Sequence, residues 1–150
     1  MNGRVLVVCA SRGRPAELAR MFDSLADTST NADVARYIDD DQQDLYADVM
    51  GRATVAIGPR IGQCRSLNHL VKKMPGYDAY GAATDDSCFR TPGWDRWVLD
   101  TVESFPGRIG IIAPFSGGGQ MDGSAPINRM DFPWVTEKWL EVVGSFTVLG

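Results

Sequence analysis

The stretch RVLVVCASRGRPAELARMFDSL, residues 4–25, sets the architecture of the N-terminal part of the chain. Its first seven residues form an apolar run that is typical of a buried strand, and SRGRP then predicts a turn. Pro15 suits the first turn of a helix, and apolar residues recur at helical spacing from Leu18 to Leu25. The stretch therefore predicts a strand, a turn and a helix, which is the opening of an α/β unit.

The same alternation continues along the chain. Strands are expected at residues 4–10, 32–38, 53–57, 77–83 and 108–115, with a further short strand at 127–130. Helices are expected at residues 16–25, 45–50, 63–74, 92–105 and 133–143, and a mobile glycine-rich loop at 116–124. Strands that alternate with helices predict an α/β fold, a mostly parallel sheet flanked by helices in a single compact domain.

The composition is that of an ordinary globular domain. The chain has 150 residues, 44% of them hydrophobic and 23% charged, with a net charge of -4. This apolar content is too high for a disordered chain, and the longest apolar runs fall far short of the roughly 20 residues that a bilayer requires. The N-terminus does not have a signal-peptide pattern. We therefore expect a cytoplasmic protein without a membrane span.

Cysteine and histidine usage excludes several kinds of site. Cys9, Cys64 and Cys88 are widely separated and lack zinc-ligand spacing, and Cys9 is expected to be buried in the first strand. His69 is the single histidine, so a mechanism that needs two histidines is excluded. We expect His69 to lie on the surface or to pack against its helix.

Charge type is more informative than net charge. There are 12 Arg against 3 Lys, and 15 Asp against 4 Glu. Arginine suits bidentate phosphate contacts, and the short aspartate side chain suits loops and metal sites. The alternative is a simple compositional bias.

Three polar clusters follow predicted strands: SRGRP at 11–15, DDDQ at 39–42 and TDDS at 84–87. In a parallel sheet these clusters share the carboxyl edge, where ligands bind. The first can also be a plain turn and helix cap, and the second a solvated loop with an Asx turn. Asp85 and Asp86 are harder to explain in that way, because adjacent acids after a buried strand repel each other unless a cation or hydrogen-bond donors neutralise them. Oxygen ligands without a nearby histidine favour Mg²⁺ or Mn²⁺.

The order of VLVVCASRGRP, YIDDD and TDDSCFRTPGWD resembles that of GT-A glycosyltransferases, the nucleotide-sugar-dependent, Rossmann-like fold that includes family 2. The likeness is strongest to small enzymes of this type from bacteriophages and actinobacteria. It covers residues 4–144, and its most specific part is 85–95. The resemblance implies a donor-binding half at about 1–115 and the start of an acceptor-side region at 116–150, which is shorter than usual.

The resemblance also implies roles for individual residues. Asp85 and Asp86 match a DxD-type motif that holds Mn²⁺ or Mg²⁺ on the donor diphosphate, with Asp86 as the direct ligand and Asp85 reaching the ribose or a metal-bound water. Ser11 and Arg12 match positions that contact the nucleotide base and ribose. Asp39 or Asp40 matches the acid that accepts a hydrogen bond from the base, and Arg65 matches a basic residue near the base and phosphates. Asn68 and Arg60 are weaker matches.

The catalytic residues are not identified by any motif. An inverting enzyme needs a general base, and the weak candidates are Asp122, Asp131 and Glu137, with Glu141 also available. Trp94, Trp134 and Trp139 are candidates for stacking on a sugar, although Trp139, like Trp97, is expected to lie in a helix core.

The function implied by the resemblance is transfer of a sugar from a nucleotide-diphosphate sugar, with a UDP-sugar favoured. The acceptor is open: a modified DNA base, a protein or a glycan. Alternatives are a nucleotide-sugar-binding module that lacks full catalysis or needs a partner, and a nucleotidyltransferase-like phosphate enzyme. A nucleotidyltransferase usually has a lysine in a glycine-rich loop after its first strand, whereas the first lysine here is Lys72. A homo-oligomer is compatible with the sequence.

Overall fold

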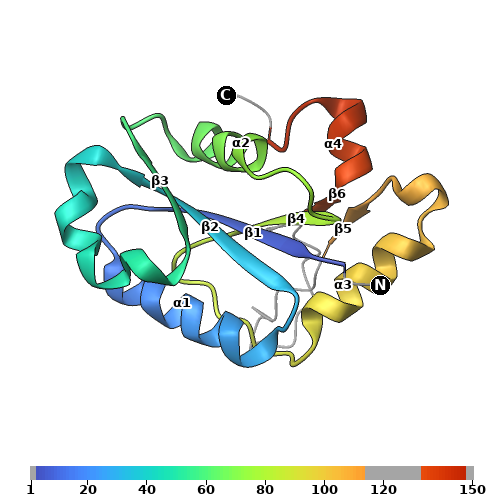
Figure 1. The fold of residues 1–150 in the computed structure, drawn as a ribbon, viewed down its shortest axis with the longest axis horizontal. Helices are drawn as coiled ribbons and strands as arrows, with labels where there is room; N and C mark the ends of the chain where they lie inside the picture. Colours follow the sequence, from blue (N-terminus) through green and yellow to red (C-terminus); the bar gives the residue numbers. More distant parts are fainter. Residues whose placement is uncertain (1–2, 114–132, 148–150) are drawn as a thin grey trace, which may run out of the picture.

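A six-stranded sheet forms the centre of the molecule, with the strand order β3-β2-β1-β4-β6-β5 (Figure 1). The computed structural model describes residues 3–113 and 133–147. The strands are β1 (Val5–Ser11), β2 (Ala32–Asp39), β3 (Thr54–Gly58), β4 (Ala79–Ala83), β5 (Ile111–Ile112) and β6 (Trp134–Thr136). β1 to β4 pair in parallel, and β6 runs antiparallel to both β4 and β5. The predicted α/β fold with a mostly parallel sheet is confirmed.

Helices cover both faces of this sheet. They are α1 (Pro15–Thr28), α2 (Gln63–Lys73), α3 (Trp94–Ser104) and α4 (Glu137–Val143), with the 3-10 helices η1 (Asp40–Arg52) and η2 (Pro106–Arg108). α1, α3 and η1 pack on one face, and α2 and α4 pack on the other (Figure 1). α1 begins at Pro15, and the apolar residues predicted from its periodicity are buried against the sheet.

β1 is the central element of the core. Val5, Val7 and Cys9 face α1 and α3, whereas Leu6 and Val8 face α2, and all five are fully buried. Burying a valine or leucine side chain contributes about 1.5–3 kcal/mol each, so β1 anchors both layers. Burial also raises the pKa of the Cys9 thiol, which agrees with its predicted role as a small buried hydrophobe.

The strand register brings the three predicted polar clusters to one edge of the sheet, where the parallel strands end. Ser11 is aligned with Ile38, and Cys9 is aligned with Ala83. The residues that follow β1, β2 and β4 therefore lie at the same carboxyl edge of the sheet.

The C-terminal part differs most from the predicted elements. Within the described part of the strand expected at 108–115, which ends at residue 113, β5 is the strand formed, because η2 and its Gly107, at a φ of 64°, turn the chain first. The helix expected from residue 133 begins at Glu137, because Trp134–Thr136 is wholly buried as β6 and Thr136 then caps α4 through the Trp139 amide. The helix expected from residue 92 begins at Trp94, since Gly93 adopts a left-handed conformation. The short helix expected at 45–50 belongs to the longer η1.

The glycine-rich loop predicted at 116–124 and the strand predicted at 127–130 lie outside the described residues. Within 3–113 and 133–147, none of the helices combines the length and the apolar character needed to span a membrane.

Candidate functional site

A chain of hydrogen bonds links the end of β1 to the acids after β4. Arg14 N–H donates to the Tyr46 hydroxyl at 3.0 Å, and the Tyr46 and Ser11 hydroxyls lie 2.6 Å apart. Ser11 donates in turn to Asp85 Oδ2 at 2.8 Å. A backbone amide can only donate and a carboxylate can only accept, so the chain has one direction, from Arg14 through Tyr46 and Ser11 to Asp85. Tyr46, Ser11 and Asp85 are all buried, so this arrangement fixes one oxygen of Asp85.

The Arg14 cluster consists of Arg14, Asp85 and Asp86. Arg14 Nη1 lies 3.4 Å from Asp85 Oδ1 and 3.2 Å from Asp86 Oδ2. Asp86 also accepts a hydrogen bond of 2.6 Å from the Thr84 hydroxyl, and this bond, together with the nearby Arg14 charge, lowers the pKa of Asp86. The two carboxylates in turn raise the pKa of the Arg14 guanidinium. Asp85 is buried, whereas the Asp86 side chain is 58% exposed and accessible to a ligand.

The Arg12 cluster consists of Arg12, Asp39 and Asp41. Arg12 contacts Asp41 through two parallel hydrogen bonds of 2.7 and 2.6 Å, and it contacts Asp39 at 2.7 Å. Hydrogen bonding to both acids raises the pKa of Arg12, and the bonds from Arg12 lower the pKa of Asp41. Asp39 is buried, so its charge is compensated chiefly by this arginine.

Other predicted nucleotide-contacting residues lie at the same edge but make fewer bonds. Asp40 is exposed at the start of η1, and Arg65 is exposed in the first turn of α2. Neither side chain forms an ion pair with the residues that the structure describes. Asn68 instead connects α2 to the C-terminal segment, since its amide oxygen accepts from the Phe146 and Thr147 amides at 2.9 Å. The structure thus gives Asn68 a structural role, and its contact with the nucleotide stays a prediction.

The candidate general bases do not join this site in the described residues. Asp122 and Asp131 lie outside them. Glu137 begins α4, and its backbone N–H donates to the Asp78 carbonyl at 3.1 Å. Because β6 is antiparallel to β4, this places Glu137 at the amino end of β4, at the opposite edge of the sheet from Asp85. Glu141 is an exposed residue further along α4 that pairs with Lys138.

The aromatic residues also require correction. Trp134 is only 3% exposed, and Trp94 packs between Phe89 and Trp134 with ring centroids 4.9 and 5.0 Å away. Trp134 is therefore a core residue that is not available for stacking on a sugar, whereas Trp94 is partly buried and packs against the core. Trp97, expected in the core, is 54% exposed on α3 because the helix faces the sheet with other residues. Trp139 packs against the core on the α2 side, as expected.

His69 packs edge-on against Tyr37, with ring centroids 5.6 Å apart. This agrees with the predicted helix-packing role.

Three residues of the site are not predicted individually from the sequence: Arg14, Tyr46 and Thr84. Arg14 belongs to the SRGRP turn and Thr84 begins the TDDS cluster, so the signal for both is their position beside Ser11, Arg12, Asp85 and Asp86. Tyr46 lies 35 residues after Ser11 and no local motif marks it.

A buried positive charge lies on the face of the sheet that α1 covers. Arg36 is aligned with Cys9 and fully buried, and its guanidinium lies over the Phe22 ring, 5.4 Å from the centroid. Within the described part of the chain its side-chain nitrogens have no hydrogen-bond partner, and burial lowers its pKa.

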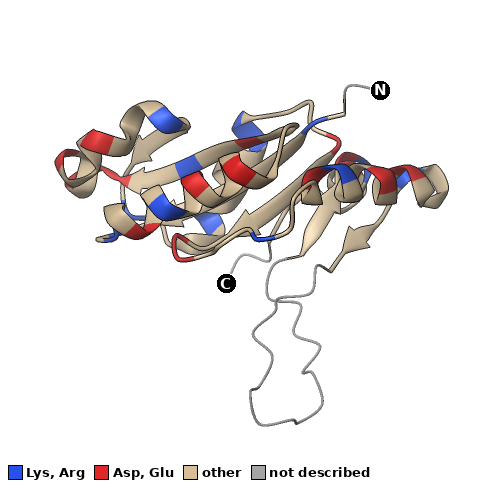
Figure 2. Cartoon of the chain, turned by 90° about the horizontal axis from the view of Figure 1, so that it is seen from below, with Lys and Arg blue, Asp and Glu red and all other residues tan. Residues whose placement is uncertain are grey.

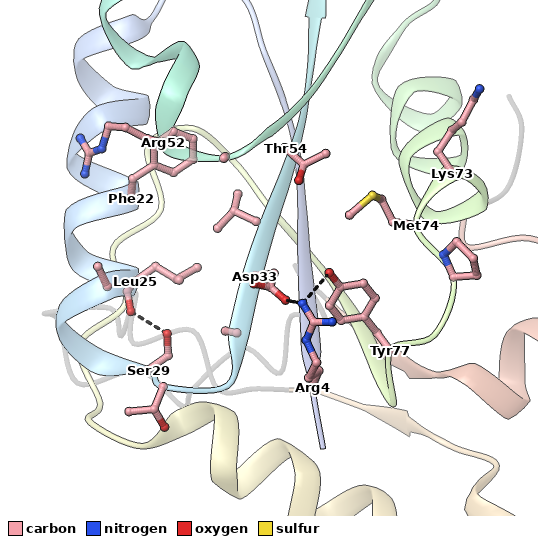
Figure 3. A pocket seen from close by; sticks show the side chains of 16 residues that line it. Arg4, Phe22, Leu25, Ser29, Asp33, Arg52, Thr54, Lys73, Met74 and Tyr77 are labelled. Carbon is pink, nitrogen blue, oxygen red and sulfur yellow. Dashed lines mark hydrogen bonds and ion pairs between the residues drawn. The ribbon is translucent and has the colours of Figure 1, made fainter. Parts of the chain in front are cut away.

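A hollow of about 810 Å³ lies at the other edge of the sheet (Figure 3). Arg4 and Asp33, from the beginnings of β1 and β2, line it and pair with each other, and Arg4 also donates to the Tyr77 hydroxyl at 3.4 Å. Its main polar groups already have partners, and it is far from the Asp85 and Asp86 carboxylates. Elsewhere, acidic and basic residues are interspersed along the helices (Figure 2). The carboxyl edge therefore remains the candidate functional site.

The donor set of the Arg14 cluster fits a hard divalent cation. Residues 3–113 and 133–147 contain no group of three or more His, Cys, Asp or Glu side chains that could hold a metal ion by themselves. Asp85 and Asp86 supply a pair of carboxylates, and Mg²⁺ is often bound by one or two carboxylates while substrate phosphates and water complete its shell. The residues present thus suit a cation that arrives with a diphosphate better than one held by protein alone.

Solved structures share this arrangement of strands and helices. The chain is similar to the mannosyltransferase PcManGT from Pyrobaculum calidifontis, solved in complex with GDP-Man and Mn²⁺, with 12% identity and a TM-score of 0.66 over 96% of this chain and 47% of that one. It is similar to S. aureus TarS 1-349, with 8% identity and a TM-score of 0.59 over 93% of this chain and 48% of that one. The chain has the GT-A fold. It spans about half the length of these two GT-A proteins.

A nucleotidyl-transferring enzyme has a related fold. The 4-diphosphocytidyl-2C-methyl-D-erythritol synthase from Anaerococcus prevotii is 9% identical, with a TM-score of 0.61 over 100% of this chain and 81% of that one. No family model matches the sequence, and no curated protein is similar to it. At these identities the GT-A likeness establishes the fold, and the activity has to be argued from the site.

Proposed function

We propose that this chain is a glycosyltransferase that takes a sugar from a nucleotide-diphosphate sugar and requires Mn²⁺ or Mg²⁺. The observation that carries the proposal is the Asp85–Asp86 carboxylate pair beside Arg14 at the carboxyl edge of a GT-A sheet. The Mn²⁺ and GDP-Man in the PcManGT complex support this chemistry. A UDP-sugar is the donor expected from the sequence resemblance, and GDP is the alternative nucleotide to compare.

Each member of the Arg14 cluster has a proposed role. The exposed Asp86 carboxylate is the direct ligand, and Asp85, fixed by Ser11, is the second acid of the pair. The cation, when bound, neutralises the charge that develops on the diphosphate leaving group. Ser11 positions Asp85 in this proposal, because its hydroxyl is already bonded to that carboxylate and adjacent to Tyr46.

The Arg12 cluster is proposed to face the nucleoside. Its carboxylates are bonded to Arg12, whereas the adjacent Asp40 is exposed and can accept a hydrogen bond from the base. Arg65, exposed at the start of α2, is proposed to contact the base or phosphates from α2, whereas the Arg12 cluster contacts the nucleoside from the ends of β1 and β2. Residues 1–115 form the donor-binding half in this proposal, with the acceptor-side region beginning at 116. No proton-transfer step is assigned to Glu137, given its place beyond the amino end of β4.

A nucleotidyltransferase is the second candidate, and the similarity to the Anaerococcus synthase over the whole chain favours it. Both reactions use a nucleotide, a divalent cation and a diphosphate or pyrophosphate leaving group. They differ in which bond breaks: a glycosyltransferase releases a nucleoside diphosphate, and a nucleotidyltransferase releases pyrophosphate. Product analysis with UDP-sugars and with CTP or GTP therefore separates them.

Calorimetric titration with UDP and GDP, each with and without Mn²⁺, tests the proposal. We expect one nucleotide to bind only with Mn²⁺, and Asp86→Ala to weaken that binding by at least 100-fold. Asp44→Ala is the matched control, because Asp44 is an exposed acid of η1 and its removal changes the net charge equally. Equal binding of both nucleotides with or without Mn²⁺, or an Asp86→Ala variant that binds like the wild type, would refute the proposed site.

A further inference from the structure

The two arginines of the turn after β1 are held very differently. Arg12 makes three contacts of 2.6–2.7 Å, which is the range of strong charge-assisted hydrogen bonds. Arg14 lies 3.2 and 3.4 Å from its two acids, and its side chain is 54% exposed. Arg14 is therefore close enough to neutralise Asp85 and Asp86, but its contacts are long for bonds of this kind.

The backbone of Arg14, by contrast, is fixed. Its N–H donates to the buried Tyr46 hydroxyl at 3.0 Å, and its carbonyl accepts from Leu18 at 3.1 Å in the first turn of α1. Pro15 follows directly and restricts the chain further. The guanidinium can therefore leave the two carboxylates by side-chain rotation alone, while the turn and the buried partners of Asp85 stay in place.

We infer that Arg14 is the resident counter-ion of the Asp85–Asp86 pair, and that a divalent cation binds this pair by displacing the Arg14 guanidinium. Two cations cannot both occupy the space between two carboxylates without strong mutual repulsion. Once displaced, the guanidinium remains tethered beside the site and is suited to an oxygen of the incoming diphosphate. This inference rests on the proposed function, since it concerns the cation and the diphosphate assigned there. Under this inference Arg14 weakens the binding of the metal ion alone and strengthens the binding of the metal ion together with the nucleotide.

The test is a titration of the protein with Mn²⁺ alone. The signal of free Mn²⁺ in electron paramagnetic resonance measures how much of the ion is bound. Arg14→Gln should bind Mn²⁺ about 10-fold more tightly than the wild type, because the competing charge is gone. Arg20→Gln is the matched control: it removes the same charge from α1, where Arg20 is 76% exposed and pairs only weakly with Glu17 at 3.7 Å. We expect that control to match the wild type. Arg14→Lys keeps a positive charge near the pair and should lie between the wild type and Arg14→Gln.

A second titration measures binding of the nucleoside diphosphate at saturating Mn²⁺. Here the expected order reverses, and Arg14→Gln should bind the nucleotide at least 5-fold less tightly than the wild type. The Arg20→Gln control distinguishes a displaced counter-ion from a general electrostatic effect, because a general effect would move both affinities in Arg20→Gln as well.

The outcomes separate this inference from the proposed function. Equal Mn²⁺ affinity in Arg14→Gln and the wild type overturns the inference, while Mn²⁺-dependent nucleotide binding by the wild type would leave the proposed function intact. Mn²⁺ binding by Arg14→Gln but not by the wild type supports the inference and leaves the proposed function intact, because that function requires Mn²⁺ together with the nucleotide. Absence of Mn²⁺ binding in both overturns the inference. Circular dichroism of each variant shows that the fold is retained.

Discussion

The Arg12 cluster and the Arg14 cluster lie on either side of β1 at the same edge of the sheet, and both contain two aspartates and one arginine. In the Arg12 cluster every contact is short, and one aspartate is bound through two parallel hydrogen bonds. In the Arg14 cluster a single guanidinium nitrogen is shared between two carboxylates at 3.2 and 3.4 Å. Residue types and neighbourhood are the same, but only the second cluster has long contacts, and we infer that it is the one that can bind another cation.

This difference separates a structural role from a ligand-binding role. Short, saturated contacts compensate a buried carboxylate and hold the ends of β1 and β2 together. Long contacts to an exposed carboxylate leave a site whose own counter-ion can be replaced. The comparison can be tested with substitutions that remove a carboxylate or one of the groups that form hydrogen bonds or ion pairs with it.

Asp95 provides the extreme case of a buried acid, and its removal should have the largest effect on stability. The residue is 1% exposed, and its Oδ2 accepts from the Thr30 and Asn31 amides at 2.9 and 2.6 Å, while Oδ1 has no partner among the described residues. Asp95→Ala leaves these donors without a partner, so the free energy of unfolding should fall by about 2–4 kcal/mol. Denaturant unfolding measures this loss. Mn²⁺ affinity of the folded fraction should stay at the wild-type value, and a large loss of affinity would show that Asp95 belongs with the ligand-binding acids.

Tyr46→Phe tests whether the fixed orientation of Asp85 matters. The change removes a buried hydroxyl that accepts from Arg14 and lies beside Ser11. Unfolding free energy should fall by about 1–2 kcal/mol. Mn²⁺ affinity should fall about 10-fold, as is typical when a group that orients a metal ligand is lost. Leu45→Ala, at an exposed neighbouring position of η1, is the control for general damage to that helix. Unchanged Mn²⁺ affinity in Tyr46→Phe would mean that Asp85 needs no support from this chain of hydrogen bonds.

The two arginines should differ in thermal stability. Arg12→Gln leaves the buried Asp39 without its cation, and the midpoint of thermal unfolding should fall by about 2–4 °C. Arg14→Gln removes only long contacts and should change the midpoint by less than about 1 °C. Differential scanning calorimetry compares the two variants directly. Equal shifts would remove the distinction between a saturated and an unsaturated cluster.

Local patterns in the sequence were sufficient for the parallel strands β1 to β4 and for the edge at which the polar clusters meet. The apolar run of β1, the proline that opens α1 and the polar residues after each strand are all read from neighbouring positions. Parallel pairing then brings Ser11, Asp39 and Asp85 to one edge without any knowledge of side-chain contacts. This is why the carboxyl edge and its acids could be predicted.

Contacts between distant segments could not be predicted in the same way. The preference of Arg12 for Asp39 and Asp41, and of Arg14 for Asp85 and Asp86, depends on side-chain directions within one turn. β6 depends on Gly81, since a Cβ at that position would lie 2.2 Å from the Trp134 ring. Pairing of β6 with β4 then moves Glu137 to the opposite edge of the sheet. The side-chain pairing and the place of Glu137 therefore depend on partners that are far apart in the chain.

The smallest effect concerns the proton affinity of Asp86. The Thr84 hydroxyl lowers the pKa of Asp86 below its ordinary value of 3.8. In Thr84→Val this pKa should rise toward that value, as followed by carbon-13 NMR of the carboxyl group. Thr91→Val is the matched control, at an exposed position away from the cluster.

The sign of the pH dependence follows from the lowered pKa. The folded protein binds the Asp86 proton less readily than the unfolded chain, so the contribution to stability is present above pH 3.8 and is lost as the pH falls through the folded pKa. Thr84→Val should reduce that contribution. Asp41 supplies the internal comparison, because its pKa is lowered by Arg12 and should not move in this variant. A shift of both carboxyl signals would show that the two clusters are electrostatically coupled rather than independent.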